Sequence, residues 1–350
     1  MKGVRLLFFL LGDILSVFTV AVILFTTLFY LVLDWYGERH WFLGMLLYLP
    51  VYVWLIPSLM LLPLSLVFCF RYSVALSFFI LGYGYFISGY QLNSLGVTQE
   101  MDSSFNLVTN NVGNNQGSSV DGFAKKHSPD ILVFQETRPG PFYRDKYPDL
   151  NVRSDGEFVL VTRLNIVEAG LLNAPTWGAF SIAARYVLEF DSKRKLVVYN
   201  IHLPTRRFFM NRVLGDGFGS VILGGAGSYG SQVRTQNRDF FKGQIEMTNK
   251  LIRQAKEELY PVILVGDFNV PARGYIYGAL SDAFNDTFVD GGRGFGFTFP
   301  GETRNPLTFN QPWLRIDHAF TSGGLSTNYA EVEKGRSSQH RGLAVSCRFQ

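Results

Sequence analysis

Apolar residues are concentrated in the first 92 residues of this 350-residue chain, and this segregation limits its fold more than any other feature. From Leu6 to Leu92 the sequence is almost wholly apolar and aromatic, whereas from Glu100 onward it resembles an ordinary soluble domain. Charged residues make up only 17% of the chain, which is low for a soluble protein, because the first third contains so few of them. We therefore expect a membrane anchor over residues 1–92, a linker over 93–103 and a soluble domain over 104–350.

Three apolar segments lie in the anchor region, over Leu6–Leu33, Trp41–Phe70 and Val74–Leu92. Each of them reaches the roughly 20 residues that a helix needs to cross the hydrocarbon core of a bilayer. The second and third segments contain proline and glycine, which membrane helices tolerate when neighbouring helices satisfy the freed backbone groups. The first segment is too long for the apolar core of a signal peptide. The sequence therefore predicts an all-α region of three transmembrane helices that holds the chain in a lipid bilayer.

Charges in the connections predict the orientation of these helices. Lys2 and Arg5 precede the first segment, and Arg71 lies between the second and third. The connection after the first segment contains Asp34 and Glu38 and has no positive excess. The positive-inside rule then places the N-terminus and the Arg71 connection in the cytoplasm. Three crossings put the soluble domain on the periplasmic or extracellular side, or in a lumen.

Short apolar runs alternate with helical patterns in the soluble domain. Helices are expected over residues 118–126 and 235–259, where polar and apolar residues alternate at helical spacing. Strands are expected at Phe105–Asn111, Ile131–Phe134, Glu157–Thr162, Ser181–Phe190, Lys195–Ile201, Val262–Val265, Ile316–Phe320 and Leu343–Phe349. Many strands with few long helices indicate an α+β sandwich of two sheets.

Acids, amides and imidazoles stand where these strands begin or end. They are Asn111, Glu136, His202, Asp267, Asn269, Asp317 and His340. A turn is the alternative explanation for Gly266-Asp-Phe-Asn269, because glycine, aspartate and asparagine all favour turns. Packing alone does not explain the whole series, so we interpret it as a site. Oxygen ligands without a nearby cysteine favour Mg²⁺ or Mn²⁺ over a structural zinc ion.

The same residues form motifs that resemble the endonuclease/exonuclease/phosphatase superfamily, the deoxyribonuclease-I-like fold. In the family's order they are Thr-Asn-Asn111-Val, Phe-Gln-Glu136-Thr, Asn-Ile-His202-Leu, Gly-Asp267-Phe-Asn269, Arg-Ile-Asp317-His and Ser-Gln-His340-Arg. The resemblance extends from Phe105 to the C-terminus. It implies a four-layer α/β sandwich, in which helices flank two mixed β-sheets, and it implies metal-dependent hydrolysis of phosphate esters.

The resemblance also implies a role for each residue. Glu136 would bind the metal, with Asn111 as a neighbouring ligand. His340 would be the general base or the group that holds the phosphate, and Asp317 would orient its ring. His202 would bind the phosphate through a hydrogen bond or act as an acid.

Four further expectations rest on the same comparison. Asp267 would position the attacking water or assist the leaving group, and Asn269 would donate to the phosphate. Glu157 matches the acid that supports the histidine of the Asn-Ile-His motif. Arg185 is a candidate phosphate ligand, although a surface acid and a solvated strand arginine are the plain alternatives for these last two residues.

The long segment between His202 and the second predicted helix contains Arg206 and Arg207, which are candidate substrate ligands. A flexible excursion without function is the alternative. One position departs from the family: Gln339 stands where an aspartate usually precedes the histidine. Glutamine keeps an oxygen acceptor and loses the charge, so we expect weaker or altered metal binding.

These observations predict a membrane-anchored, metal-dependent phosphodiesterase or nuclease-like hydrolase. A His–Asp pair would activate the water, and the substrate would be a phospholipid headgroup or a nucleic acid. The formal net charge of +4 is too small to choose between these substrates. The alternative function, favoured by Gln339 alone, is a membrane scaffold or receptor built on an inactive hydrolase fold. No protein partner is evident in the sequence.

Overall fold

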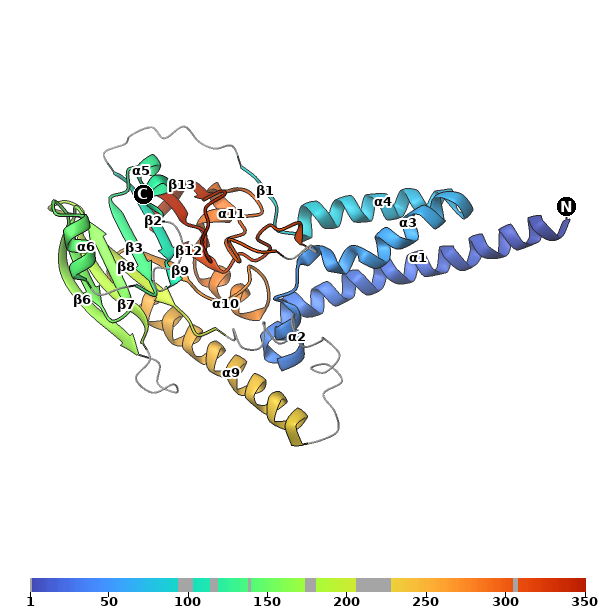
Figure 1. The fold of residues 1–350 in the computed structure, drawn as a ribbon, viewed down its shortest axis with the longest axis horizontal. Helices are drawn as coiled ribbons and strands as arrows, with labels where there is room; N and C mark the ends of the chain where they lie inside the picture. The colour runs from blue at the N-terminus through green and yellow to red at the C-terminus, as the bar shows by residue number, and fades with distance from the viewer. Residues whose placement is uncertain are drawn as a thin grey trace.

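The computed structural model describes residues 2–93, 103–113, 119–137, 140–173, 181–205, 228–304 and 308–350. Three apolar helices, α1, α3 and α4, run side by side away from an α/β sandwich that contains the rest of the described chain (Figure 1). The fold thus separates the apolar and the mixed parts of the sequence into two regions in space.

The N-terminal region contains three stretches that are long and apolar enough to cross a membrane, Arg5–Arg39, Val51–Phe68 and Phe70–Ile87. The helices are α1 (Lys2–Tyr36), η1 (Gly37–Arg39), α2 (Trp41–Leu46), η2 (Val51–Leu55), α3 (Ile56–Phe68), α4 (Phe70–Gly82) and η3 (Tyr83–Ile87). Most large apolar side chains of α1, α3 and α4 are exposed, which suits contact with lipid and suggests membrane association.

The second apolar segment is shorter than the sequence predicted, and the third is shifted toward the N-terminus, from Val74–Leu92 to Phe70–Ile87. Residues 41–50 do not continue into the second span: they form α2 and a turn that ends at Pro50, whose backbone is extended. Proline lacks an N–H and disfavours a helix before it, which explains the break. At the other end, Gln91–Leu92 (β1) leave the third helix and pair with Arg293–Gly294 (β11) of the sandwich.

Twelve strands of the described chain form two six-stranded sheets. The first sheet has the order β10 (Asn285–Asp286), β12 (Asp317–Thr321), β9 (Val262–Asp267), β8 (Lys195–His202), β7 (Ser181–Glu189), β6 (Asn165–Asn173). The second has the order β13 (Leu325–Val332), β14 (Leu343–Phe349), β2 (Ser104–Asn111), β3 (Ile131–Gln135), β5 (Phe158–Thr162), β4 (Asn151–Asp155). Both sheets are mixed, because β8 and β9 are parallel, β2 and β3 are parallel, and the other pairs are antiparallel.

Helices cover both outer faces of the paired sheets. Alternate side chains of each strand face opposite ways, so Val198 packs between the sheets while Tyr199 packs toward α9. The covering helices are α9 (Ser228–Lys256) and α10 (Tyr275–Ala283) on the first sheet, and α5 (Asp121–His127) and α6 (Pro141–Lys146) on the second; α11 (Thr287–Gly291) contacts β13. This arrangement confirms the predicted four-layer α/β sandwich.

The connection between α1 and α3 packs against the sandwich directly behind the end of β9. Tyr48 donates a hydrogen bond through its hydroxyl to the carbonyl oxygen of Asn269, at 2.7 Å. Arg273 donates to the carbonyl oxygen of Leu47, and the Trp313 indole donates to that of Tyr48, both at 3.1 Å. The apolar N-terminal region is therefore joined to the sandwich by specific hydrogen bonds.

Candidate active site

Asp267 is the last residue of β9 and lies at the centre of a cluster of polar side chains. The strand register places it beside His202, the last residue of β8, and opposite Asp317, the first residue of β12. One carboxylate therefore has an imidazole on one side and a second carboxylate on the other. Asp267 and Asp317 are buried.

Gly266 allows this close approach of β8 and β9. Its φ of +135° lies outside the range that L side chains usually adopt, and a Cβ there would lie 2.2 Å from the carbonyl oxygen of Ile201. Three residues after Gly266, Asn269 adopts a left-handed φ of +50°. Non-glycine residues in this conformation are uncommon and concentrate at functional sites. The sequence Gly-Asp-Phe-Asn thus has a backbone requirement as well as a chemical one.

Asn269 fixes the turn after β9. Its backbone N–H donates to Asp267 Oδ1 at 2.9 Å, and its side-chain Nδ2 donates to the carbonyl oxygen of Leu203 at 2.8 Å. A primary amide has two N–H donors, and Leu203 accepts from one of them. The predicted donation from Asn269 to a phosphate would use the other.

Asn111 joins the second sheet to this cluster. Its Nδ2 donates to Glu136 Oε1 at 3.1 Å and to Asp267 Oδ2 at 2.9 Å, while its Oδ1 accepts from the N–H of Gly113. The ligand role of Asn111 stays a prediction, because in this conformation the nitrogen and not the oxygen of its amide faces the carboxylates. Asn111 instead holds Glu136 and Asp267 side by side, and it would have to turn its amide to bind a metal.

Glu157 and Glu136 flank the ring of His202. His202 Nδ1 lies 2.8 Å from Glu157 Oε1, so the position predicted for the supporting acid is the one found. The other ring nitrogen, Nε2, lies 3.4 Å from Glu136 Oε1 and 3.9 Å from Asp267 Oδ2. Glu136 also has a left-handed φ of +50°.

Asp317 holds the ring of His340 in the same manner. His340 Nδ1 lies 3.0 Å from Asp317 Oδ2, and Nε2 lies 3.7 Å from Asp267 Oδ2. His340 lies in the loop between β13 and β14. Arg336 donates to the carbonyl oxygen of His340, and the ring of Phe299 packs against the imidazole. Two carboxylate–imidazole pairs therefore point their Nε2 atoms toward Asp267.

The surrounding charges raise the pKa of both histidines. Burial opposes the charged form of His340, but Asp317 and Asp267 outweigh it and raise its pKa to about 9. Burial likewise opposes the charged form of His202, but its hydrogen bond to Glu157 and the nearby acids Asp267 and Glu136 outweigh burial and raise its pKa. Burial also raises the pKa of Asp267, although His340 counteracts this effect. Both rings thus favour the imidazolium form.

The donor set fits a divalent cation of the hard type. Two groups of side chains bring their ligand atoms within 4.8 Å of one another: Glu136, His202 and Asp267, and then Asp267, Asp317 and His340. With Glu157 included, the cluster brings together four carboxyl groups and two imidazole rings. Oxygen donors dominate the cluster, as Mg²⁺ and Mn²⁺ require.

The structure places Arg185, the candidate phosphate ligand, away from this cluster. Arg185 lies opposite Tyr199 in β7, where the side chain faces the helical layer and not the space between the sheets. Its guanidinium donates to Glu258 and to Glu168 and does not reach the cluster. The other two arginines that were predicted to bind substrate, Arg206 and Arg207, lie outside the described residues.

Gln339 precedes His340 as an exposed residue, and its side-chain Oε1 lies 3.4 Å from the position that a Cβ on Gly113 would take. It thus borders the loop that follows Asn111. Sequence reasoning missed the layer beneath the site, where Gln135 donates to Asn200 Oδ1 at 2.5 Å and links the two sheets. The signal was present, because Asn200 stands two residues before His202 and shares its face of the strand.

Comparisons with known proteins agree with this arrangement. The sequence model of the Endonuclease/Exonuclease/phosphatase family matches residues 105–340, which is well over half of the chain. No curated protein sequence matches the chain.

Three solved structures are similar to the chain, each at 16% identity. An endonuclease/exonuclease/phosphatase family protein from Bacteroides thetaiotaomicron has a TM-score of 0.48, with 71% of this chain and 98% of that chain covered. A humanised TDP2 of D. rerio has a TM-score of 0.47 (70% and 99% covered). A mannosyl-6-phosphatase of B. thetaiotaomicron has a TM-score of 0.45 (70% and 100% covered). Similarities this low say nothing about the substrate of this chain.

Proposed function

Because the chain belongs to the endonuclease/exonuclease/phosphatase family, we propose that it is a membrane-anchored, divalent-metal-dependent phosphoesterase that hydrolyses phosphodiester bonds. One observation carries the proposal: two carboxylate–imidazole pairs, His202 with Glu157 and His340 with Asp317, face the single carboxylate of Asp267. A scaffold has no need of two buried imidazolium rings around a carboxylate. Such a cluster is costly to bury and suits an anionic substrate.

Each side chain has a task in this proposal. Glu136 and Asp267 would hold the divalent cation, which supplies Lewis-acid polarisation of the phosphoryl group when bound. The Nε2 atoms of His202 and His340 would donate to phosphate oxygens and stabilise the negative charge that develops there. Asp267, with its raised pKa, would also accept a hydrogen bond from the attacking water.

The protonation state of His340 favours one of its two expected roles. With a pKa of about 9, roughly one ring in a hundred is neutral at pH 7. A general base must be neutral, whereas a group that holds the phosphate must carry its proton. We therefore propose that His340 holds the phosphate and that Asp317 keeps its ring charged and oriented. Activation of water by the His340–Asp317 pair is the less favoured role.

The proposal predicts metal-dependent turnover of bis-p-nitrophenyl phosphate by the purified full-length protein in detergent. Release of p-nitrophenolate should require added Mg²⁺ or Mn²⁺ and should stop with EDTA, because the carboxylates of the cluster need a counter-cation to admit an anionic ester. Parallel incubations with plasmid DNA, sphingomyelin and phosphoinositides would identify the substrate class. Equal rates with Mg²⁺ and with EDTA, or no turnover of any of these esters, would contradict the proposal and favour the scaffold function.

We further propose that the three apolar stretches cross the membrane and that the sandwich lies on the periplasmic or extracellular side. Arg71 follows the short break between Phe68 and Phe70 that separates the second and third stretches, where a cytoplasmic turn is expected. Alkaline phosphatase fused after Gln350 should be active, and a fluorescent protein that folds only in the cytoplasm should stay dark at the same position. The reverse pattern would refute this orientation.

A further inference from the structure

A cavity lies where the N-terminal helices meet the sandwich. This junction cavity has a volume of about 100 Å³ and is lined from the α1–α3 connection, the end of the third apolar stretch, and the segments that follow β9 and precede β12. A water molecule occupies about 30 Å³ in the liquid, so the space admits a group of several heavy atoms. None of the carboxylates or imidazoles of the candidate active site lines it.

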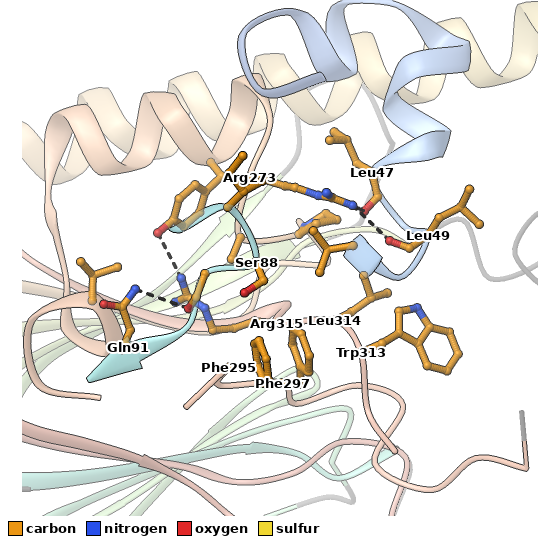
Figure 2. Close-up of a pocket in the computed structure, with 17 residues that line it drawn as sticks. Leu47, Leu49, Ser88, Gln91, Arg273, Phe295, Phe297, Trp313, Leu314 and Arg315 are labelled. Carbon is orange, nitrogen blue, oxygen red and sulfur yellow. Dashed lines mark hydrogen bonds between the residues drawn. The ribbon is translucent and has the colours of Figure 1, made fainter. Parts of the chain in front are cut away.

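Arg273 lines this cavity and is more than nine-tenths buried. Its Nη2 donates to the carbonyl oxygens of Leu47 and Leu49, both at 3.1 Å, and Figure 2 shows the side chain extended toward them. Its Nη1 has no hydrogen-bond partner among the residues that the structure describes. A buried charged donor without an acceptor destabilises the fold unless something binds it. The arginine therefore offers a hydrogen bond that the described chain leaves unused.

The charges around the cavity favour an anion as the missing partner. Arg315 also lines the cavity, but its guanidinium already donates hydrogen bonds to the carboxylate of Asp286 and to the hydroxyl of Tyr277. No carboxylate lines the cavity among the described residues, and no carboxylate oxygen lies within ion-pair distance of Arg273 in that part of the chain. Asp34 and Glu38 act on Arg273 electrostatically but do not line the cavity, so the two guanidinium groups on the walls face a space whose described lining contains no acid (Figure 2).

The position of the cavity relates it to a membrane surface. Val51 begins the second apolar stretch and Ile87 ends the third, and both residues line the cavity. Trp313 and Phe297 add aromatic surface to the same walls. Aromatic and basic side chains at the ends of membrane spans lie at the level of lipid headgroups.

We propose that the junction cavity binds a phosphate group through Arg273, either as the headgroup of an anionic phospholipid or as free phosphate. The bound group accepts from Nη1 of Arg273 while Nη2 keeps its hydrogen bonds to the α1–α3 connection. Arg273 follows Asn269 by four residues, so an occupied cavity also stabilises the segment that leads away from the candidate active site. This second phosphate site is independent of the reaction proposed above.

The test measures the melting midpoint of the full-length protein in detergent, with EDTA present so that no ester is hydrolysed. The probes are inorganic phosphate and dihexanoylphosphatidylglycerol, each titrated over a wide range of concentrations. Arg273→Gln removes the donor, and Ala272→Leu fills the cavity while it leaves the arginine and its backbone hydrogen bonds in place. Arg293→Gln is the matched control, because it removes an exposed arginine of the nearby β11 that does not line the cavity.

We expect at least one probe to raise the melting midpoint of the unsubstituted protein and of Arg293→Gln at the same concentrations. Arg273→Gln and Ala272→Leu should need about a tenfold higher concentration of that probe for the same rise in melting midpoint. Arg273→Gln loses a charge-assisted hydrogen bond, and Ala272→Leu loses the space for the anion. A response to the lipid alone identifies a headgroup, and a response to phosphate alone identifies a soluble anion. The proposal is overturned if neither probe stabilises the protein or if all four proteins respond equally.

Discussion

Glu136→Gln is expected to lower kcat/KM for bis-p-nitrophenyl phosphate at least about 100-fold. Glutamine has the shape of glutamate, and its Oε1 can still accept from Asn111 Nδ2, so this contact within the second sheet stays. The substitution removes only the negative charge beside Asp267, which is the charge that a divalent cation needs. The loss should therefore appear in metal binding as well as in turnover.

Binding of Mn²⁺ to the full-length protein, followed by electron paramagnetic resonance, gives a readout that does not depend on activity. Glu331→Gln is the matched control: Glu331 lies 3.5 Å from His127 Nε2, much as Glu136 lies 3.4 Å from His202 Nε2, but it belongs to β13 at the edge of the second sheet. Glu331→Gln should keep its affinity for Mn²⁺ and its kcat/KM within about twofold of the unsubstituted protein. If Glu136→Gln binds Mn²⁺ and turns over as the unsubstituted protein does, Glu136 is not a metal ligand.

The sequence alone predicts the strands that carry this site. Each buried apolar run ends in an acid, amide or imidazole, and packing does not require such a side chain there. Glu136 and Asp267 follow runs of four or more apolar residues, so their positions at sheet ends were predictable. The order of the motifs then indicated the four-layer sandwich. Gly266 shows that such a motif also reflects a backbone requirement. A side chain at this position would collide with the backbone of Ile201, so only glycine fits.

The face toward which a strand residue points was harder to predict. Arg185 and His318 both stand on largely buried strands, but a shift of one residue moves a side chain to the opposite face. His318 follows Asp317 and so points away from the cluster, toward Arg315 and the carbonyl oxygen of Val270. Burial and Arg315 lower its pKa to about 4, which is opposite to the effect on His340. Only the strand register decides whether a side chain such as that of His318 faces the cluster or the opposite side of the sheet.

Contacts between distant segments were invisible in the sequence. Tyr48 lies in an apolar run that reads as part of a membrane span, and nothing near it indicates a partner 221 residues away. Its hydroxyl nevertheless bonds to the carbonyl oxygen of Asn269, and Gln244 of α9 donates to the same oxygen at 3.3 Å. The residues between α1 and α3 therefore support the candidate active site, so the N-terminal region contributes more than attachment.

His340 and Asp317 are expected to act as one unit. His340→Gln should lower kcat about 10²–10⁴-fold, because glutamine can donate to Asp317 but carries no titratable proton. His127→Gln removes a histidine that also faces a carboxylate, on the outer helix α5, and should leave kcat unchanged. Asp317→Asn should be impaired as well, and the double variant should lose little more than His340→Gln does. Losses that multiply in the double variant would show that the two residues act independently.

The pH profile decides between the two roles of His340. A ring that holds the phosphate must be protonated, so activity should be steady at neutral pH and fall as the pH rises through the pKa of about 9. A bound divalent cation moves this midpoint downward, since a nearby positive charge disfavours the imidazolium, but it does not reverse the direction. Asp317 is the strongest of the charges that raise this pKa, so Asp317→Asn should move the midpoint to lower pH by about one unit or more. Activity that instead rises through this range would assign His340 as the general base, and a midpoint that Asp317→Asn leaves in place would mean that another group titrates.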